Sequence, residues 1–240
     1  MQIAVISLAG QLERRRQIAA QFAGRGLDWR FFDGIRVSQF PPEYDAGYRR
    51  RWFGFDLGLG ELGCFLSHRA LWRECGSSSD RGWCILEDDI QLLPGFAQAL
   101  GELEQRSGDW DVVRLMGHMP RRGWAQHRLP GGWALQMHPR QPGGTHGYVI
   151  TPAAARRMWA YTRRIYEPVD NALDTYWRHR LNIFCLAPPV IALAPGLTST
   201  IAQRGTRRRP RWPGLKRDLR KGFSLFERLL FNQRHYGRWR

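Results

Sequence analysis

Residues 3–34 read IAVISLAGQLERRRQIAAQFAGRGLDWRFFDG. The apolar run at 3–8 predicts a buried strand, and residues 11–22 continue with helical character until Gly24 and Gly26 end the helix. Residues 29–32 predict a second strand. A strand, a helix and a strand in this order begin a parallel sheet. We therefore predict an α/β, Rossmann-like fold, in which a mostly parallel sheet is flanked by helices.

The rest of the chain supplies further elements of the same two kinds. Strands are expected at 82–86, 111–116, 148–150 and 184–193, and helices at 64–75, from Thr151-Pro152 and from Pro168. Residues 41–55 show no clear periodicity, so we expect a loop there. Residues 117–147 contain 11 glycines and prolines among 31 residues. We expect a second, long loop there, of the kind that carries function in compact domains.

Length and composition indicate one globular domain. The chain has 240 residues, 43% of them hydrophobic, which is enough to bury a core. No apolar stretch approaches the roughly 18 residues needed to span a membrane. The first 16 residues place a short apolar run before three arginines, the reverse of a secretory signal, so we expect a cytoplasmic location. The four cysteines form no C-x-x-C pair, and we expect them to pack as small apolar side chains.

The net charge of +16 is concentrated at the carboxyl end. Residues 204–240 carry 13 lysines and arginines and 2 acids, a net charge of +11, which leaves +5 for the other 203 residues. We therefore divide the chain into a domain, 1–203, and a basic tail, 204–240. Apolar residues recur in the tail at helical spacing, which is typical of an amphipathic helix on a membrane surface; a solvated basic tail has the same composition. A polyanionic neighbour is expected: lipid headgroups, phosphorylated glycolipid or nucleic acid.

Three consecutive acids follow the predicted strand at 82–86. On an extended backbone, Glu87 and Asp89 point to one side and Asp88 to the other. Ligands of open α/β sheets bind beyond the carboxyl ends of strands, and two carboxylates on one side can hold a divalent cation and, through it, a diphosphate. Surface acids after a strand are also common, so composition alone leaves both interpretations open.

Other residues suited to chemistry are spread along the chain. The glycines of GELGCFLSH, residues 60–68, let backbone approach a ligand, while His68 fits either a buried, hydrogen-bonded histidine or a ligand. Asp170 and Asp174 share one helix face, and either could accept a proton from a hydroxyl or be a capping and a solvated acid. Residues 143–148 combine glycines with a strand start, which fits a ligand contact or a plain turn. The histidines of 117–147 are spaced by 9, 11 and 8 residues, which fits no zinc site.

These segments together resemble glycosyltransferase family 25. The resemblance covers about residues 2–203 and rests on Ile6-Ser7-Leu8 with Arg14, GELGCFLSH, ILEDDI (85–90), WDVVRL (110–115), GTHGYVIT (144–151) with PAAARR, PVD (168–170) and Ser199-Thr200-Ile201. The family contains bacterial lipooligosaccharide galactosyl- and glucosyltransferases and relatives of collagen galactosyltransferase domains. Ser7 departs from the family, which usually has asparagine at this position.

The resemblance implies a GT-A-like fold, a UDP-sugar donor, inversion at the anomeric carbon and a divalent metal, Mn²⁺ or Mg²⁺. It implies a lipopolysaccharide or lipooligosaccharide acceptor, with galactose as the hexose most frequent in the family. The metal ligands would be Asp89 and Glu87, and the general base Asp170 or, failing that, Asp174. The implied donor-binding residues are Ser7, Arg14, Gly60, Glu61, Ser67, His68, Asp88, Thr145, His146 and Tyr148. Among these, Arg14 would neutralise the diphosphate, Asp88 could face the ribose, and the last three would approach the transferred sugar.

A glycolipid acceptor also gives the basic tail a role. We expect the protein to lie peripherally on the cytoplasmic face of the inner membrane, with the tail on anionic lipid. The first alternative is a polyanion-binding protein, for nucleic acid or anionic lipid, without transferase activity. Nucleic acid is not expected, because the charge lies in the tail and no RNP, helix-turn-helix or finger motif is present. A second alternative is a catalytically inactive family member that acts as a lipid-surface scaffold.

Overall fold

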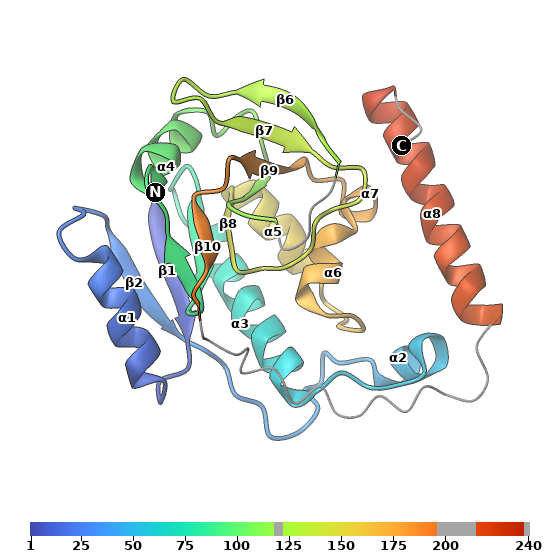
Figure 1. Ribbon diagram of the computed structural model, residues 1–240. Helices are drawn as coiled ribbons and strands as arrows, with labels where there is room; N and C mark the ends of the chain where they lie inside the picture. Colours follow the sequence, from blue (N-terminus) through green and yellow to red (C-terminus); the bar gives the residue numbers. More distant parts are fainter. Residues whose placement is uncertain (118–121, 196–214, 238–240) are drawn as a thin grey trace.

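A computed structural model describes residues 1–117, 122–195 and 215–237 (Figure 1). Its strands are β1 (Gln2–Ser7), β2 (Trp29–Asp33), β3 (Trp83–Glu87), β4 (Ile90–Leu92), β5 (Val112–Arg114), β6 (Trp124–Arg128), β7 (Ala134–Met137), β8 (Gly147–Ile150), β9 (Ile183–Ala187) and β10 (Ile191–Leu193). Its helices are α1 (Leu12–Phe22), α2 (Ala46–Phe53), α3 (Leu59–Gly76), α4 (Phe96–Gln105), α5 (Pro152–Tyr161), α6 (Val169–Asp174), α7 (Tyr176–His179) and α8 (Leu215–Tyr236).

The centre of the fold is an eight-stranded sheet in the order β2-β1-β3-β8-β5-β9-β7-β6. β1 is parallel to both β2 and β3, and β5 is parallel to β9. β8 and β7 run against their neighbours, so the other six strands point the same way. A separate two-stranded sheet joins β10 and β4. The predicted α/β architecture, with a mostly parallel sheet flanked by helices, is confirmed.

The first three strands do not lie in chain order, because β1 stands between β2 and β3. The chain crosses from β1 through α1 to β2 on one side, and then through α3 to β3 on the other side. Because such crossovers are right-handed, α1 and α3 cover opposite faces of the sheet, and in Figure 1 they flank β1. β1 and β3 are therefore covered on both faces and read as continuous apolar runs, with Val5 and Ile85 fully buried.

The expected elements at 3–8, 11–22, 29–32, 64–75 and 82–86 are confirmed as β1, α1, β2, α3 and β3. Thr151 caps α5 as predicted, accepting a hydrogen bond from the amide of Ala154. Of the four cysteines, Cys75, Cys84 and Cys185 are buried, as expected.

Two predicted loops are wrong. Residues 41–55 contain α2, whose ends are set by caps: the Asp45 side chain accepts from the amide of Tyr48, and Gly54 closes the helix in a left-handed conformation. Residues 117–147 contain β6 and β7, a hairpin that extends the sheet by pairing with β9. The helix expected from Pro168 is also interrupted, because Thr175 separates α6 from α7.

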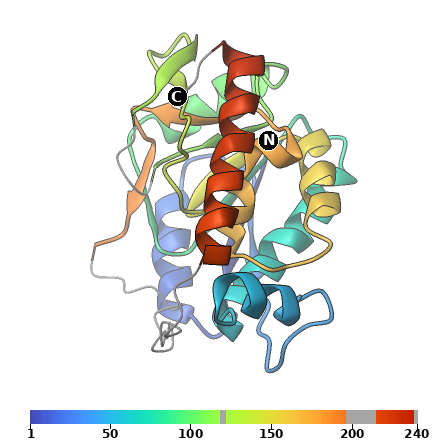
Figure 2. The same cartoon turned by 90° about the vertical axis from the view of Figure 1, so that its right-hand side faces the viewer.

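A helix is present in the predicted basic tail. α8 stands on the side of the molecule opposite to α1 in Figure 1, and Figure 2 shows its full length facing the viewer. Asn232 is fully buried and accepts a hydrogen bond of 2.7 Å from the Tyr176 hydroxyl, so the helix packs on the domain. Among the described residues, none of the helices has the length and apolarity of a membrane span. The boundary predicted at 203 and Ser199-Thr200-Ile201 lie outside the described residues.

Candidate active site

A cleft lies at the carboxyl ends of β1, β2 and β3, where the strand order reverses. This is the position at which open α/β sheets bind their ligands. The cleft has a volume of about 580 Å³. It is lined by Ile6, Ser7, Leu8, Gln11, Arg14, Gly34, Ile35, Gly60, Cys64, Ser67, Glu87, Asp88 and Asp89. The structure thus brings the three acids together with four other predicted site residues, Ser7, Arg14, Gly60 and Ser67.

The three consecutive acids divide between two sides of the cleft. The Oε2 of Glu87 and the Oδ1 of Asp89 lie 3.6 and 3.5 Å from the Nδ1 of His146. Asp88 faces away from them, as predicted. The reason differs from the predicted one. β3 ends at Glu87, and Asp88 and Asp89 lie in a turn, not on extended backbone.

Asp88 is fixed by β1 and α1. Its Oδ2 accepts a hydrogen bond of 2.7 Å from the Ser7 hydroxyl, and its Oδ1 accepts one of 2.8 Å from Arg14. All three side chains are largely buried, so the ion pair is shielded from solvent. Arg14 thus lies in the cleft as predicted, and its charge is balanced by Asp88.

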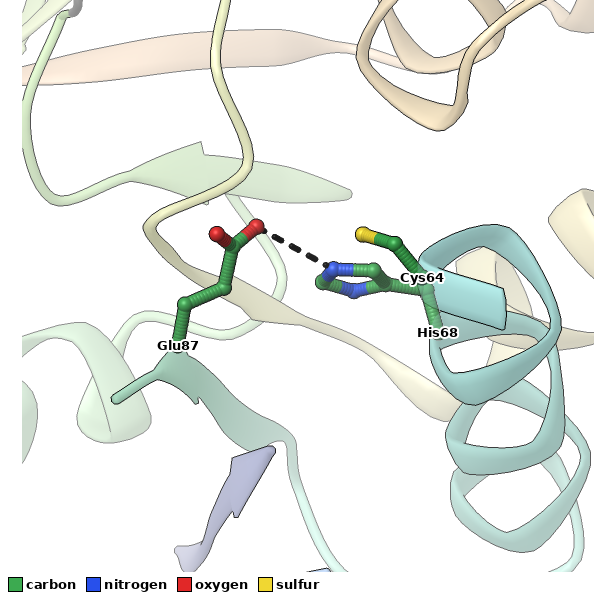
Figure 3. A group of neighbouring side chains, drawn as sticks. All are labelled: Cys64, His68 and Glu87. Carbon is green, nitrogen blue, oxygen red and sulfur yellow. Dashed lines mark ion pairs between the residues drawn. The ribbon is translucent and has the colours of Figure 1, made fainter. Parts of the chain in front are cut away.

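A chain of hydrogen bonds runs from the core to Glu87. The indole nitrogen of Trp72 donates to the Tyr148 hydroxyl at 2.8 Å, and this hydroxyl lies 3.0 Å from the Nδ1 of His68. A hydroxyl can accept twice but donates once, and the described residues give this one no acceptor other than Nδ1. Donation to Nδ1 therefore satisfies its proton, and the imidazole proton is then on Nε2. Nε2 faces the Oε1 of Glu87 at 3.4 Å (Figure 3). His68 is thus a buried positioning residue for Glu87, and Tyr148 lies behind it, fully buried.

The surroundings of Glu87 favour its ionised form. Burial alone would raise the pKa of this carboxyl, but His68, His146 and a 2.6 Å hydrogen bond from Thr145 lower it to about 2. Burial likewise would lower the pKa of His146, and the nearby charges of Asp89, Glu87 and Asp170 raise it. The cleft therefore concentrates negative charge on one side of His146.

Two groups of side chains have the geometry of a metal site within the described residues. In each group the potential ligand atoms lie within 4.8 Å of one another: Glu87, Asp89 and His146 in one, Cys64, His68 and Glu87 in the other. In the second group the His68 nitrogen carries a proton, and burial raises the pKa of the Cys64 thiol well above its usual value. The first group offers two carboxylates, ligands that suit Mn²⁺ or Mg²⁺, and so fits the predicted metal.

Two predicted donor-binding residues, Glu61 and Ser67, have structural contacts, and a third, Gly60, faces open space. Glu61 accepts from the amide of Gly58 and caps α3. The Ser67 hydroxyl accepts from the amide of Ile35 and donates to the carbonyl of Gly63, both at 2.8 Å, and so holds the loop after β2 against α3. Gly60 has open space where a side chain would project, which leaves the cleft wide there.

The two candidate bases differ in their surroundings. Asp170 lies in the first turn of α6, and its charge contributes to the raised pKa of His146, which places it on the cleft side. Asp174 forms an ion pair with Arg114, a fully buried side chain of β5. Arg114 also donates to the carbonyl of Gly144, so it joins the segment before His146 to α6. Sequence reasoning missed this role; an arginine inside an apolar strand, WDVVRL, was the available signal.

A sequence model described as "Glycosyltransferase family 25 (LPS biosynthesis protein)" matches residues 1–129. The "Lacto-N-neotetraose biosynthesis glycosyltransferase LgtB" of Neisseria meningitidis serogroup B is 34% identical over 216 residues, which cover 80% of this chain and 75% of that protein. The chain belongs to glycosyltransferase family 25. The family resemblance found in the motifs of the cleft is thereby confirmed.

Similarity of this family 25 chain to longer relatives is partial. A "Glycosyltransferase 25 family member" of Aedes aegypti is 32% identical over 126 residues, 46% of this chain, and the chain spans only 20% of that protein. A solved glycosyltransferase involved in the glycosylation of the major capsid of PBCV-1 superimposes with a TM-score of 0.44 at 8% identity, covering 82% of this chain and 93% of that one.

Proposed function

We propose that this family 25 member is an inverting hexosyltransferase. It would move a hexose, with galactose the favoured candidate, from a UDP-sugar to a lipooligosaccharide or lipopolysaccharide acceptor. The observation that carries the proposal is the pair of carboxyl groups of Glu87 and Asp89, 3.6 and 3.5 Å from His146 at the point where the strand order reverses. The surroundings of Glu87 lower its pKa to about 2. The diphosphate of a UDP-sugar needs a cation held by carboxylates such as these, and its nucleoside needs an adjacent cleft. The likeness to LgtB supports the acceptor class.

The residues of the cleft have separate roles in this proposal. Glu87 and Asp89 would hold the divalent cation, which when bound neutralises charge on the diphosphate leaving group. Asp88, which is held by Ser7 and Arg14, would accept a hydrogen bond from a ribose hydroxyl. His146, which lies 3.6 and 3.5 Å from Glu87 and Asp89, would contact the transferred sugar.

Transfer with inversion requires one base. The acceptor hydroxyl oxygen forms a bond to the anomeric carbon as the bond from that carbon to the diphosphate oxygen breaks, and the hydroxyl proton passes to the base. Asp170 is on the cleft side of α6 and is assigned this role. Asp174 is already paired with Arg114, which makes it the less available proton acceptor. A positioned base contributes about 10²–10⁴-fold in rate.

The deciding experiment measures UDP released from UDP-galactose, UDP-glucose and the two UDP-N-acetylhexosamines, with and without Mn²⁺. Metal-dependent release from one donor supports the proposal and names the sugar. Asp89→Ala should abolish release, and Asp170→Asn should abolish transfer to an acceptor. Asp109→Asn, at an exposed carboxylate, is the matched control. Absence of both UDP binding and release would refute the transferase and favour a polyanion-binding protein or an inactive scaffold.

A further inference from the structure

Helix α8 presents an apolar stripe to solvent. Leu219, Phe223 and Phe226 follow one another at spacings of four and three residues and therefore share one face of the helix. Their exposed fractions are 61%, 62% and 57%. Isolated apolar residues on a surface are ordinary, but three large ones in a row on one helix mark a contact surface.

The opposite face of α8 is the one that packs on the domain. Asn232 contacts Tyr176 on α7, and Glu227 accepts two hydrogen bonds, of 3.1 and 2.9 Å, from Arg178. The guanidinium of Arg220 lies 3.9 Å from the ring centre of Phe53 on α2. The ring of Phe231 also packs on Tyr176, with 5.7 Å between the ring centres. Polar and apolar groups of the inner face thus fix the helix to the domain, and the outer apolar stripe takes no part in that contact.

Charge decides which partner suits this stripe. Helix α8 carries six lysines and arginines and two acids, and the tail 204–240 carries a net charge of +11. Two copies of the helix would bring like charges together, which opposes pairing of α8 with a second chain. An anionic lipid surface attracts the basic residues and accepts the apolar side chains below its headgroups.

We propose that the outer face of α8, defined by Leu219, Phe223 and Phe226, binds an anionic membrane surface. The contact also orients the active site. Helix α8 packs on α7, which follows α6 directly along the chain, through the hydrogen bond between Tyr176 and Asn232, so the membrane-binding helix adjoins the segment that carries the assigned base. An acceptor that projects from the membrane would meet the protein on this side. The binding itself does not depend on the proposed transferase activity.

The test is co-sedimentation of the full chain with vesicles of phosphatidylcholine alone and of phosphatidylcholine mixed with phosphatidylglycerol. Binding is expected to the mixed vesicles and to fall when salt is raised to about 1 M, where the screening length is about 3 Å. Phe223→Ser and Phe226→Ser should each lower the partition coefficient about tenfold. Lys221→Gln should lower it about fivefold.

Leu12→Ser is the matched control, because Leu12 on α1 has the same exposed fraction as Leu219, 61%. It should leave vesicle binding unchanged. All four variants alter exposed side chains, and their circular dichroism and UDP release without lipid should match the parent protein. Three results would overturn the proposal: equal binding to neutral vesicles, no binding to either kind, or a dimer in sedimentation that Phe223→Ser with Phe226→Ser dissociates.

Discussion

Removal of the Arg114 guanidinium should loosen both sides of the active site. Arg114 is 1% exposed and pairs with Asp174, whose side chain is 24% exposed. Taking away one partner of a buried pair costs about 3–5 kcal/mol, and partial exposure of Asp174 favours the lower end, about 3 kcal/mol. For a chain of this size each kcal/mol lowers Tm by about 2–4 °C. Arg114→Met should therefore lower Tm by about 6–12 °C, measured by calorimetry.

Two comparisons separate this ion pair from a general loss of stability. Arg16→Met removes a pair whose side chains are 77% and 71% exposed, and should change the free energy of unfolding by less than about 0.5 kcal/mol. In a double-mutant cycle, Asp174→Leu should cost less in the Arg114→Met background than in the parent chain, by about 1–3 kcal/mol. Additive effects would refute the reasoning, since they would mean that the two side chains are not coupled.

Two further predictions concern packing and pH. Gly63→Ala should destabilise the fold by about 1–3 kcal/mol in urea denaturation, because its methyl group would collide with the carbonyl oxygen of Ile35, whereas Gly60→Ala has open space and should stabilise α3 by up to about 1 kcal/mol. Equal effects of the two substitutions would contradict this account. Burial lowers the pKa of His179 from 6.5 to about 4, so the folded state disfavours its protonation. Stability from this group is complete above pH 6.5 and falls by about 3 kcal/mol as the pH drops from 6.5 to 4. His179→Gln should flatten the pH profile over that window, and an unchanged profile would exclude His179 as its source.

The sequence predicted the elements whose residues follow a strong apolar pattern. β1, α1, β2, α3 and β3 all bury continuous or periodic apolar runs, and they are also the elements that build the cleft. Helix α2 was missed because its buried residue is Arg49, whose guanidinium lies over Phe53 and Phe55. A helix held by cation–π contacts and caps shows no apolar periodicity in its sequence, although the capping residues Asp45 and Gly54 marked its two ends.

The hairpin of β6 and β7 was missed for a related reason. Its outer strand, Trp124–Arg128, is largely exposed and carries a register shift, so alternation is weak. Glycine and proline content suggested a loop, whereas pairing with β9 supplies the hydrogen bonds that local propensity does not. Helix α4 was not predicted either, although its sequence does carry a helical apolar pattern, at Phe96, Ala99, Leu100 and Leu103.

At the site, the position and chemical type of the acids could be predicted, but their partners could not. Strand alternation predicted that Asp88 faces away from Glu87 and Asp89; the structure shows this separation, but a turn at residues 88–89 produces it. Partners such as Arg114 with Asp174 are 60 residues apart along the chain, and only the packing of β5 against α6 brings them together. Such pairings are tertiary and leave no local signature in one sequence.

The contacts between Trp72 and Glu87 share one direction. An indole nitrogen donates and never accepts, and the Tyr148 hydroxyl that receives its proton has Nδ1 of His68 as its one acceptor among the described residues, so the proton of each group points toward the cleft. With phenylalanine at position 72, the Tyr148 hydroxyl would be released to turn toward another acceptor. His68 would then be able to present a lone pair instead of a proton to the carboxylate. Trp72, a side chain of the core, thus favours the orientation in which His68 presents a proton to Glu87, the carboxylate proposed as a metal ligand, and substitution of Trp72 should change the affinity of that site for divalent cations.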